Sequence, residues 1–299
     1  MSDRQEGGAR FHKASKQDGS GKPLISVITA AFNAAGYLPD TIRSIRAQSY
    51  HDFEWIVIDG GSSDATVDLL KANDDIIAYW LSEPDCGIYS ALNKGLAQVR
   101  GEWICILGAD DFLWDAQALA RMAEQLQKLP ASVRVAYGQV MLISDDGKVI
   151  HAFGEPWENV KERFKQMMCI PHQATMHRRS LFERHGKFDE SFSIAGDYEF
   201  LLRELKSADA RFIPGIIMTA MRQGGGISSI PANSLKVLRE SRRAQRKNGQ
   251  YFPGWIWLMA YVRLYIRLLL WKILGERLAR KALDLGRRVM GLPPFWTKA

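Results

Sequence analysis

The chain has 299 residues, 46% of them hydrophobic and 24% charged, with a formal net charge of +7. This ordinary globular composition suits one large or two modest domains with a sizeable core. Residues 232–299 hold 15 Lys/Arg against 3 Asp/Glu, a net +12, so the first 231 residues carry −5. The basic character belongs to the C-terminal part, and the chain as a whole gives no nucleic-acid signal.

Residues 1–22 are polar and rich in Gly and Ser, without the apolar core of a signal peptide, and we predict a disordered leader there. The cysteines Cys86, Cys105 and Cys169 are far apart in the sequence. They show neither CxxC nor Cys/His metal spacing, which favours a reducing compartment and cysteines that serve packing.

After residue 23, short β-rich runs alternate with amphipathic helical windows. This alternation predicts an α/β fold with a mainly parallel central sheet and helices on both faces. We expect strands at Leu24–Ala30, Phe53–Ile58, Ile76–Leu81, Glu102–Leu107, Val133–Ile143 and Val149–Phe153, and helices at Tyr37–Gln48, Asp64–Lys71, Gly87–Val99 and Asp115–Lys128. The sequence "SDDGK" is expected to join the last two strands in a turn.

Polar side chains follow each of the first four predicted strands, namely Asn33, Asp59, Asp85, and the adjacent Asp110 and Asp111. Ligands bind at the carboxyl ends of the strands in open α/β sheets, so we expect these residues at one rim. Each has a structural alternative, since an aspartate can shape a glycine turn or cap the next helix. Their recurrence at one rim favours a binding site.

An acidic rim suits a hard divalent cation, Mg²⁺ or Mn²⁺, which prefers carboxylate oxygens and commonly carries a phosphate ligand. Such a cation offsets charge on a diphosphate leaving group. The sequence has no GxGxxG after the first strand and no GxxxxGK[ST], so it lacks the specific signatures of dinucleotide-binding and P-loop proteins.

Three segments together resemble the family 2 glycosyltransferases of the GT-A fold. They are "PLISVITAAFNAAGYLPDTIRSIRAQSYHDFEWIVIDGGSSDAT", "SEPDCGIYSALNKGLAQVRGEWICILGADDFLW" and "PHQATMHRRSLFERHGKFDESFSIAGDYEFLLREL", and they span residues 23–220. The resemblance is strongest to bacterial enzymes that assemble capsule, exopolysaccharide or O-antigen repeats. It implies a nucleotide-sugar donor, a divalent cation and an inverting displacement at the anomeric carbon.

The family's DxD element matches "GAD" in this chain. The resemblance assigns Asp110 to the cation and makes Asp111 a second ligand or an orienting residue. Gly108 stands at the first acidic position, so one carboxylate of the usual pattern is missing. The following residues are assigned to the nucleotide sugar: Ala30, Phe32, Asn33, Asp59, Asp85, Tyr89, Asn93, Lys94 and Asp110.

Two of these assignments depart from the family or stay open. Asp59 is the candidate for the base or ribose, but Gly60 replaces the second aspartate that commonly follows it. Lys94 is the nearest match to a basic residue that relatives place in this helix. Its side chain either faces the phosphates or lies in solvent.

The resemblance assigns the general base of the reaction to Asp197 in "SIAGDYEFLLRELK", with Gly196 in place of the preceding acid. The alternative is that Asp197 only caps the helix. His172 is placed on the acceptor side. His177 lies five residues later, which does not match the spacing of a helical metal site, and it is assigned to packing or surface.

The last third of the chain contains two further features. The segment "QGGGISS" is either a mobile loop over the donor site or a plain linker. Residues 231–299 form a basic, apolar helical tail in which Arg263, Arg267 and Lys272 argue against a membrane-spanning helix. A cationic face opposite an apolar one favours a helix in an anionic membrane interface, against docking on its own domain. Gly275 and Gly286 are candidate breaks.

These observations predict a catalytic domain at residues 23–230 followed by the tail. The resemblance implies a metal-dependent inverting glycosyltransferase that uses a nucleotide sugar, with UDP favoured, and it suggests a lipid-linked acceptor of the undecaprenyl-diphosphate type. We expect a peripheral protein on the cytoplasmic face of the inner membrane, with no nucleic-acid partner and the oligomeric state open. The alternatives are a nucleotidyltransferase acting on sugar phosphates and a non-enzymatic basic membrane-binding protein.

Overall fold

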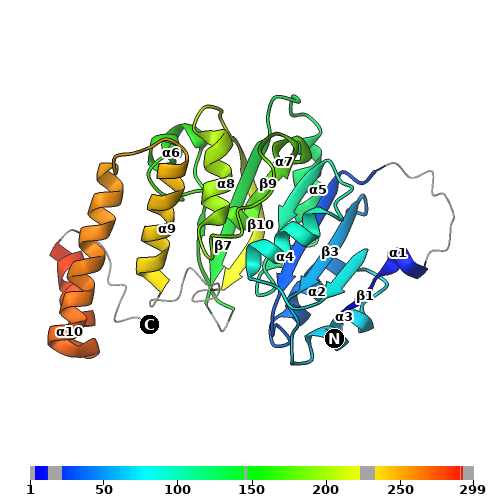
Figure 1. The fold of residues 1–299 in the computed structure, drawn as a ribbon, viewed down its shortest axis with the longest axis horizontal. Helices are drawn as coiled ribbons and strands as arrows, with labels where there is room; N and C mark the ends of the chain where they lie inside the picture. Colours follow the sequence, from blue (N-terminus) through cyan, green and yellow to red (C-terminus); the bar gives the residue numbers. More distant parts are fainter. Residues whose placement is uncertain (1–3, 13–21, 145–146, 223–232, 290, 292–299) are drawn as a thin grey trace.

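The computed structural model describes residues 4–12, 22–144, 147–222, 233–289 and 291. Its first half is a parallel sheet in the order β4-β3-β2-β5 (Figure 1). The strands are β2 (Ile25–Ala31), β3 (Phe53–Asp59), β4 (Tyr79–Ser82) and β5 (Trp103–Ile106). Almost every residue of these strands is buried, as expected for a sheet covered on both faces.

The second half of the sheet continues beyond β5, where β9 (Thr175–Arg178) runs antiparallel between β5 and β7 (Val135–Ile143). Next to β7 lies the parallel strand β10 (Arg211–Arg222). The strands β6 (Phe112–Leu113) and β8 (Val149–Phe153) pair antiparallel with β10 and β7. The prediction of a mainly parallel α/β sheet is confirmed, and residues 145–146 of the predicted turn lie outside the described part.

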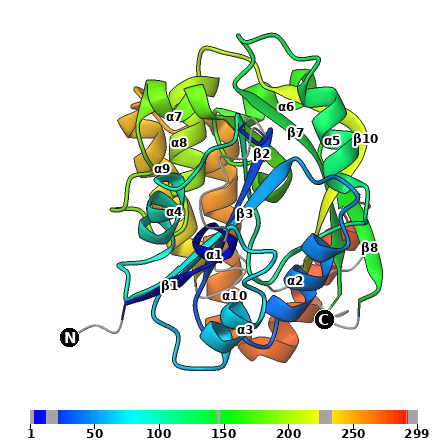
Figure 2. The same ribbon diagram turned by 90° about the vertical axis from the view of Figure 1, so that its right-hand side faces the viewer.

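Helices cover both faces of this sheet. Figure 2 shows α4, α8 and α9 on one side and α2 and α5 on the other. Two clusters of buried side chains correspond to these two layers, one around Leu38 and Met122, the other around Tyr89, Phe164 and Phe200. The helices that cover the sheet include α2 (Leu38–Arg46), α3 (Thr66–Ala72), α4 (Ile88–Leu96), α5 (Ala118–Leu126), α6 (Trp157–Phe164), α7 (Arg179–His185) and α8 (Gly196–Leu205).

The predicted disordered leader is wrong for residues 4–12. They form the strand β1 (Gln5–Gly7), which pairs antiparallel with β4, and the short helix α1 (Ala9–His12). The pairing covers the edge of β4, which would otherwise present unpaired backbone groups. In α1, Arg10 donates to the buried carboxylate of Glu54 at 2.5 Å. The N-terminal segment therefore belongs to the fold.

The predicted boundary at residue 231 does not separate a tail from the catalytic domain. The helix α9 (Ser234–Lys247) packs beside α8 and buries Glu240, Arg242 and Gln245. The last helix, α10 (Trp255–Val289), lies on the outer side of α9 (Figure 1). The segment "QGGGISS" lies outside the described residues.

The break predicted at Gly275 is confirmed, since this residue has φ 69° and ψ 170° inside α10. Gly286 lies within the helix. Because the break separates two helical stretches, the predicted cationic face does not continue from the first stretch into the second. Among the residues that the structure describes, no helix combines the length and the apolar character needed to cross a bilayer.

We expect Arg10→Ala to lower the free energy of unfolding by about 1–3 kcal/mol, because Glu54 would keep a buried carboxylate without its guanidinium partner. Urea denaturation measures this change. Arg4→Ala is the matched control, since the Arg4 pair with Glu6 is exposed and should leave the midpoint nearly unchanged. Equal midpoints for both variants and the wild type would contradict a structural role for the leader.

Candidate active site

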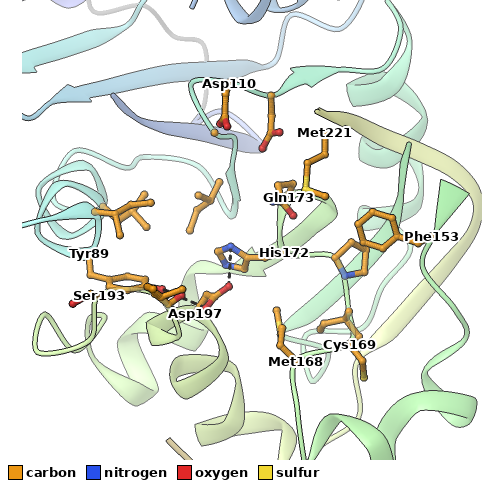
Figure 3. Close-up of a pocket in the computed structure, with 18 residues that line it drawn as sticks. Tyr89, Asp110, Phe153, Met168, Cys169, His172, Gln173, Ser193, Asp197 and Met221 are labelled. Atoms are coloured by element: carbon orange, nitrogen blue, oxygen red, sulfur yellow. Dashed lines mark hydrogen bonds and ion pairs between the residues drawn. The ribbon is translucent and has the colours of Figure 1, made fainter. Parts of the chain in front are cut away.

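A pocket of about 500 Å³ lies where the carboxyl end of β5 meets the start of α8 (Figure 3). Asp110 and Asp111 line one side of it. Tyr89, His172 and Asp197 line the opposite side. These five predicted site residues come from four separate segments, and the fold brings them together.

The acidic end of the pocket is built around Gly108. A Cβ at this position would lie 2.7 Å from Asp111 Oδ2 and 2.8 Å from Asp110 Oδ1, so both carboxylates converge on the space that a side chain would fill. Asp111 is only 4% exposed. Burial, followed by the neighbouring charge of Asp110, raises the pKa of Asp111 well above its usual range. Two crowded carboxylates of this kind are stabilised by a cation.

These two carboxylates fit a hard divalent cation, which prefers carboxylate oxygens. Across the described ranges, no group of three or more His, Cys, Asp or Glu residues is placed to hold a metal ion. The chain therefore offers Asp110 and Asp111, and further ligands would have to come from a bound phosphate or from water.

Thr41, which no pattern in the sequence singled out, contacts the backbone of the loop at the acidic end of the pocket. Its hydroxyl, buried in α2, contacts the carbonyl oxygens of Ala109 at 3.0 Å and of Asp111 at 2.7 Å. These contacts fix the backbone of the loop that carries both aspartates. No spacing in the sequence connects Thr41 with this loop, which lies about 70 residues away.

Asp197 lies at the opposite end of the pocket, in the first turn of α8. Its side chain is 22% exposed, and its carboxylate accepts a hydrogen bond from the backbone N–H of Tyr198 at 2.8 Å. Burial raises the pKa of Asp197 to about 6. The helix begins after Ala195, which makes no side-chain cap. Asp197 is therefore inside the helix and does not act as its N-cap, which removes the capping alternative.

The hydroxyl of Tyr89 fixes the backbone around Asp197. It accepts hydrogen bonds from the N–H groups of Gly196 at 2.8 Å and Asp197 at 3.2 Å. Its own proton is directed to the carbonyl of Ile194 at 2.7 Å, with Asp197 Oδ1 at 3.3 Å. Tyr89 was expected at the nucleotide sugar, and the structure gives it this positioning role at the edge of the pocket.

His172 approaches the same carboxylate, with Nδ1 3.8 Å from Asp197 Oδ2. Burial lowers the pKa of His172 to about 4, so the ring is neutral at pH 7. The fully buried His177 packs edge-on against it at 5.2 Å, and burial lowers the pKa of His177 to about 3. The assignment of His177 to packing is confirmed, and His172 lines the pocket as a neutral group.

The loops after β2 and β3 meet at the predicted rim. The backbone N–H of Asn33 donates to the Ser62 hydroxyl at 2.7 Å, and its side-chain oxygen accepts the N–H of Ser63 at 3.0 Å. Asn33 has a positive φ of 48°, which asparagine tolerates better than most residues. The neighbouring Phe32 ring is 64% exposed at this rim. Asp85 lies over Gly60, which has no side chain to block it.

Asp59 does not face the rim as expected, because its side chain is fully buried. Its carboxylate accepts hydrogen bonds from the N–H groups of Gly61 at 3.2 Å and Ser62 at 2.9 Å, from the Ser82 hydroxyl at 2.6 Å and from the Ser62 hydroxyl. The structure therefore supports the alternative that Asp59 shapes the glycine turn after its strand. Asp59 shapes the loop after β3 and reaches a ligand only through that loop.

Three further residues expected at the nucleotide sugar have contacts within the protein. The buried Asn93 exchanges hydrogen bonds with the backbone of Phe188 at 3.0 Å, so it joins α4 to a distant loop. Lys94 forms an ion pair with Glu83 at 2.8 Å, and its place at the phosphates or in solvent stays a prediction. Ala30 is partly buried and packs on the core beneath the rim.

No pattern in the sequence indicated the apolar wall of the pocket. One wall of the pocket is formed by side chains that are nearly all apolar or sulfur-containing. Figure 3 shows four of them, Phe153, Met168, Cys169 and Met221, facing the same space. They come from β8, from the segment before β9 and from the end of β10: Phe153, Met168, Cys169, Ile170, Pro171 and Met221. This part of the pocket can accommodate an apolar group.

Comparison with solved structures gives the same fold. A mannosyltransferase from Pyrobaculum calidifontis, solved with GDP-Man and Mn²⁺, superposes with a TM-score of 0.59 at 18% identity, covering 88% of this chain and 75% of that chain. S. aureus TarS 1-349, solved with UDP-GlcNAc, superposes with a TM-score of 0.56 at 18% identity, covering 74% and 66%. The chain thus spans slightly less than two thirds of that TarS structure.

Sequence comparison is more specific. An uncharacterised glycosyltransferase of Mycobacterium tuberculosis is 37% identical over 183 residues, which cover 60% of this chain and 68% of the relative. A PGL/p-HBAD biosynthesis glycosyltransferase of Mycobacterium bovis is 32% identical over 230 residues, covering 74% and 86%. Residues 26–186 match glycosyl transferase family 2. The nucleotidyltransferase and non-enzymatic alternatives are thereby set aside, and the chain belongs to glycosyl transferase family 2.

Proposed function

We propose that the protein is a metal-dependent, inverting glycosyltransferase that moves a sugar from a nucleotide sugar to a lipid-linked glycan. The observation that carries this proposal is the placement of Asp197 across one pocket from Asp110 and Asp111. One end offers adjacent carboxylates for a cation, and the other offers a single carboxylate with a raised pKa. An inverting transfer from a diphosphate donor can use a cation at the leaving group and a general base at the acceptor hydroxyl.

At the acidic end, Asp110 and Asp111 would hold Mn²⁺ or Mg²⁺ together with the donor diphosphate. The cation supplies positive charge beside a leaving group that becomes more negative in the transition state. Thr41 keeps the loop of these carboxylates in place, because its hydroxyl directs its proton to the carbonyl of Asp111 at 2.7 Å, with the carbonyl of Ala109 at 3.0 Å. Gly108 leaves the space above them open.

At the other end, Asp197 acts as the general base. The acceptor hydroxyl oxygen attacks the anomeric carbon from the face opposite the diphosphate, and the bond from that carbon to the diphosphate oxygen breaks. The hydroxyl proton passes to Asp197, and the nucleoside diphosphate leaves with the bonding electron pair. The attack from the opposite face inverts the anomeric configuration. His172 is neutral at pH 7 and therefore does not hold the carboxylate ionised as a cation would.

The nucleoside is proposed to lie along the loops after β2 and β3. The exposed Phe32 ring and Asn33 face outward there, and Asp59 sets the loop from within. We favour a uridine nucleotide, because TarS was solved with UDP-GlcNAc. The mannosyltransferase from Pyrobaculum calidifontis was solved with GDP-Man, so GDP-sugars are also to be tested as donors.

A lipid-linked acceptor of the undecaprenyl-diphosphate type is proposed from two apolar surfaces. The first is the apolar wall of the pocket next to Asp197. The second is a stripe on α10 that leaves several large side chains exposed at helical spacing, Leu258, Val262, Ile266, Leu269 and Ile273. A relative named for PGL/p-HBAD biosynthesis is consistent with synthesis of surface glycans.

The helix α10 also contacts its own domain. Trp257 donates its indole N–H to the carbonyl of Leu238 in α9 at 3.1 Å, and Leu264 is buried. The docking alternative thus accounts for one face, and the exposed apolar stripe remains on another. Exposed basic residues lie on both sides of the break at Gly275: Arg263 and Lys272 are in the same helical stretch as the stripe, and Arg277, Lys281 and Arg288 come after it. We propose that this surface lies on anionic lipid at the cytoplasmic face of the inner membrane.

Asp197→Asn is expected to lower the rate by at least about 100-fold, because an amide cannot take the hydroxyl proton. The assay measures release of nucleoside diphosphate from UDP-, GDP- and dTDP-sugars with Mn²⁺ or Mg²⁺. In the wild type, the rate should fall below about pH 6, where Asp197 becomes protonated. An unchanged rate in the variant would refute the assignment of the base.

Gly108→Ala is expected to weaken Mn²⁺-dependent activity, because its Cβ would push the carboxylates of Asp110 and Asp111 apart. The apparent Mn²⁺ affinity is measured from the rate as the metal concentration is varied. Gly36→Ala is the control, since no atom lies within 4 Å of a Cβ there. The same metal dependence in both variants would argue against this pair as the metal site.

The membrane proposal is tested on the full chain by liposome flotation. A triple substitution of Ile266, Leu269 and Ile273 by Ser removes the exposed apolar stripe, and flotation with phosphatidylglycerol vesicles should be lost. A control with Val149 and Ile150 replaced by Ser changes exposed apolar residues elsewhere and should float like the wild type. Equal flotation of all three proteins would remove the membrane proposal.

A further inference from the structure

We propose that Glu240, on α9, is a positioning residue that fixes the general base Asp197 in the pocket. The inference rests on the proposed function, because it takes Asp197 as the base. Glu240 lies in the part of the sequence that was expected to be a tail, outside the catalytic domain. Its side chain does not line the pocket, so it acts through the backbone that precedes α8.

The carboxylate of Glu240 binds three consecutive backbone N–H groups. It accepts hydrogen bonds from Ser193 at 3.1 Å, Ile194 at 2.8 Å and Ala195 at 3.0 Å. The residue is only 8% exposed. Since α8 begins at Gly196, these N–H groups lie at the positive end of the helix, where an anion is stabilised. Glu240 thus supplies the negative charge for the start of α8.

The same face of α9 holds the rest of this loop. Three and seven residues after Glu240, Arg243 donates to the carbonyl of Ser191 at 3.1 Å and Lys247 pairs with Asp189 at 2.8 Å. Residues at this spacing share one helix face. The guanidinium of Arg243 also lies 4.3 Å from the centre of the Phe192 ring. α9 therefore holds the whole segment 189–195.

On the other side, Tyr89 of α4 holds Gly196 and Asp197 through their N–H groups. The backbone that carries the base is therefore fixed between α4 and α9. Only one residue separates the last N–H bound by Glu240 from Asp197. A misplacement of a catalytic group by about 1 Å can cost about 100-fold in rate, so this anchoring bears directly on turnover.

Glu240 also contributes its charge to the surroundings of Asp197. The groups that face Asp197 are Tyr89 from α4, the neutral His172 from the segment before β9, and Glu240 from α9, with Asp110 and Asp111 across the pocket. Burial is the main cause of the raised pKa of Asp197, and the negative charge of Glu240 raises that pKa further. Removing this charge lowers the pKa of Asp197.

The test compares Glu240→Gln, Glu240→Asp and Glu204→Gln in the full chain, with release of UDP from a UDP-sugar and Mn²⁺ as the assay. Glu240→Gln should lower kcat by about 10- to 100-fold with little change in donor KM, and should shift the acid limb of the pH profile to lower pH. Glu240→Asp keeps the charge but shortens the reach. It should lower kcat and leave the acid limb in place.

Glu204→Gln is the matched control, since it removes a buried carboxylate of α8 that binds Arg134 and His185 and does not touch the segment 193–195. Its pH profile should match the wild type. Hydrogen exchange gives a readout without activity, and the amides of 193–195 should exchange faster in Glu240→Gln than in Glu204→Gln.

Unchanged exchange at 193–195 in Glu240→Gln, or a kcat equal to that of the wild type, would overturn the positioning role. Asp197→Asn in the same assay separates this failure from failure of the proposed function. If Asp197→Asn is inactive while Glu240→Gln behaves as the wild type, only the inference about Glu240 fails. If Asp197→Asn remains active, the base itself is misassigned.

Discussion

The hydroxyl of Tyr89 joins the two halves of the molecule at the point where the proposed base lies. Tyr89 belongs to α4, which packs on the first, parallel half of the sheet, and it binds the N–H groups of Gly196 and Asp197 at the start of α8. The residue that precedes this helix, Ala195, has no side chain that can cap it. Tyr89 therefore supplies from another helix an acceptor for the first N–H groups of α8, while Glu240 binds the N–H groups of the three residues that precede the helix.

The carboxylates at the two ends of the pocket have different surroundings, which suit them to different proposed roles. Asp110 and Asp111 are adjacent and crowded over Gly108, so their repulsion favours binding of a cation. Asp197 is isolated beside a neutral His172, and its pKa near 6 leaves it ionised at pH 7 yet able to take a proton. The position of each carboxylate in the fold, and not its residue type, determines its role.

The sequence was sufficient for the first four parallel strands and for the edge at which they end, because strand periodicity and the order of α/β units determine where strand ends meet. The strands β1, β6, β9 and β10 were not predicted. It did not determine which way a side chain at a strand end points. Asp59 turns inward to hold its own loop, and Asn93 turns to a loop 95 residues away. Whether such a residue binds a ligand or the backbone depends on tertiary neighbours that local patterns do not encode.

The role of Glu240 also depends on tertiary neighbours that the sequence pattern does not reveal. Charge composition placed it in a basic tail, yet α9 is part of the scaffold that carries the proposed base. The leader was misjudged for a related reason, since its polar composition conceals a strand whose partner is the edge of β4. Composition describes average solvation, while these segments are ordered by a few specific backbone hydrogen bonds.

If one end of the pocket binds the cation and the other holds the base, titration calorimetry of UDP binding with and without Mn²⁺ separates the two ends. Asp110→Asn should lose the Mn²⁺-dependent part of UDP binding, while Asp197→Asn should bind UDP as tightly as the wild type despite its loss of turnover. Wild-type Mn²⁺-dependent binding in Asp110→Asn, or weakened UDP binding in Asp197→Asn, would contradict this division between the two ends.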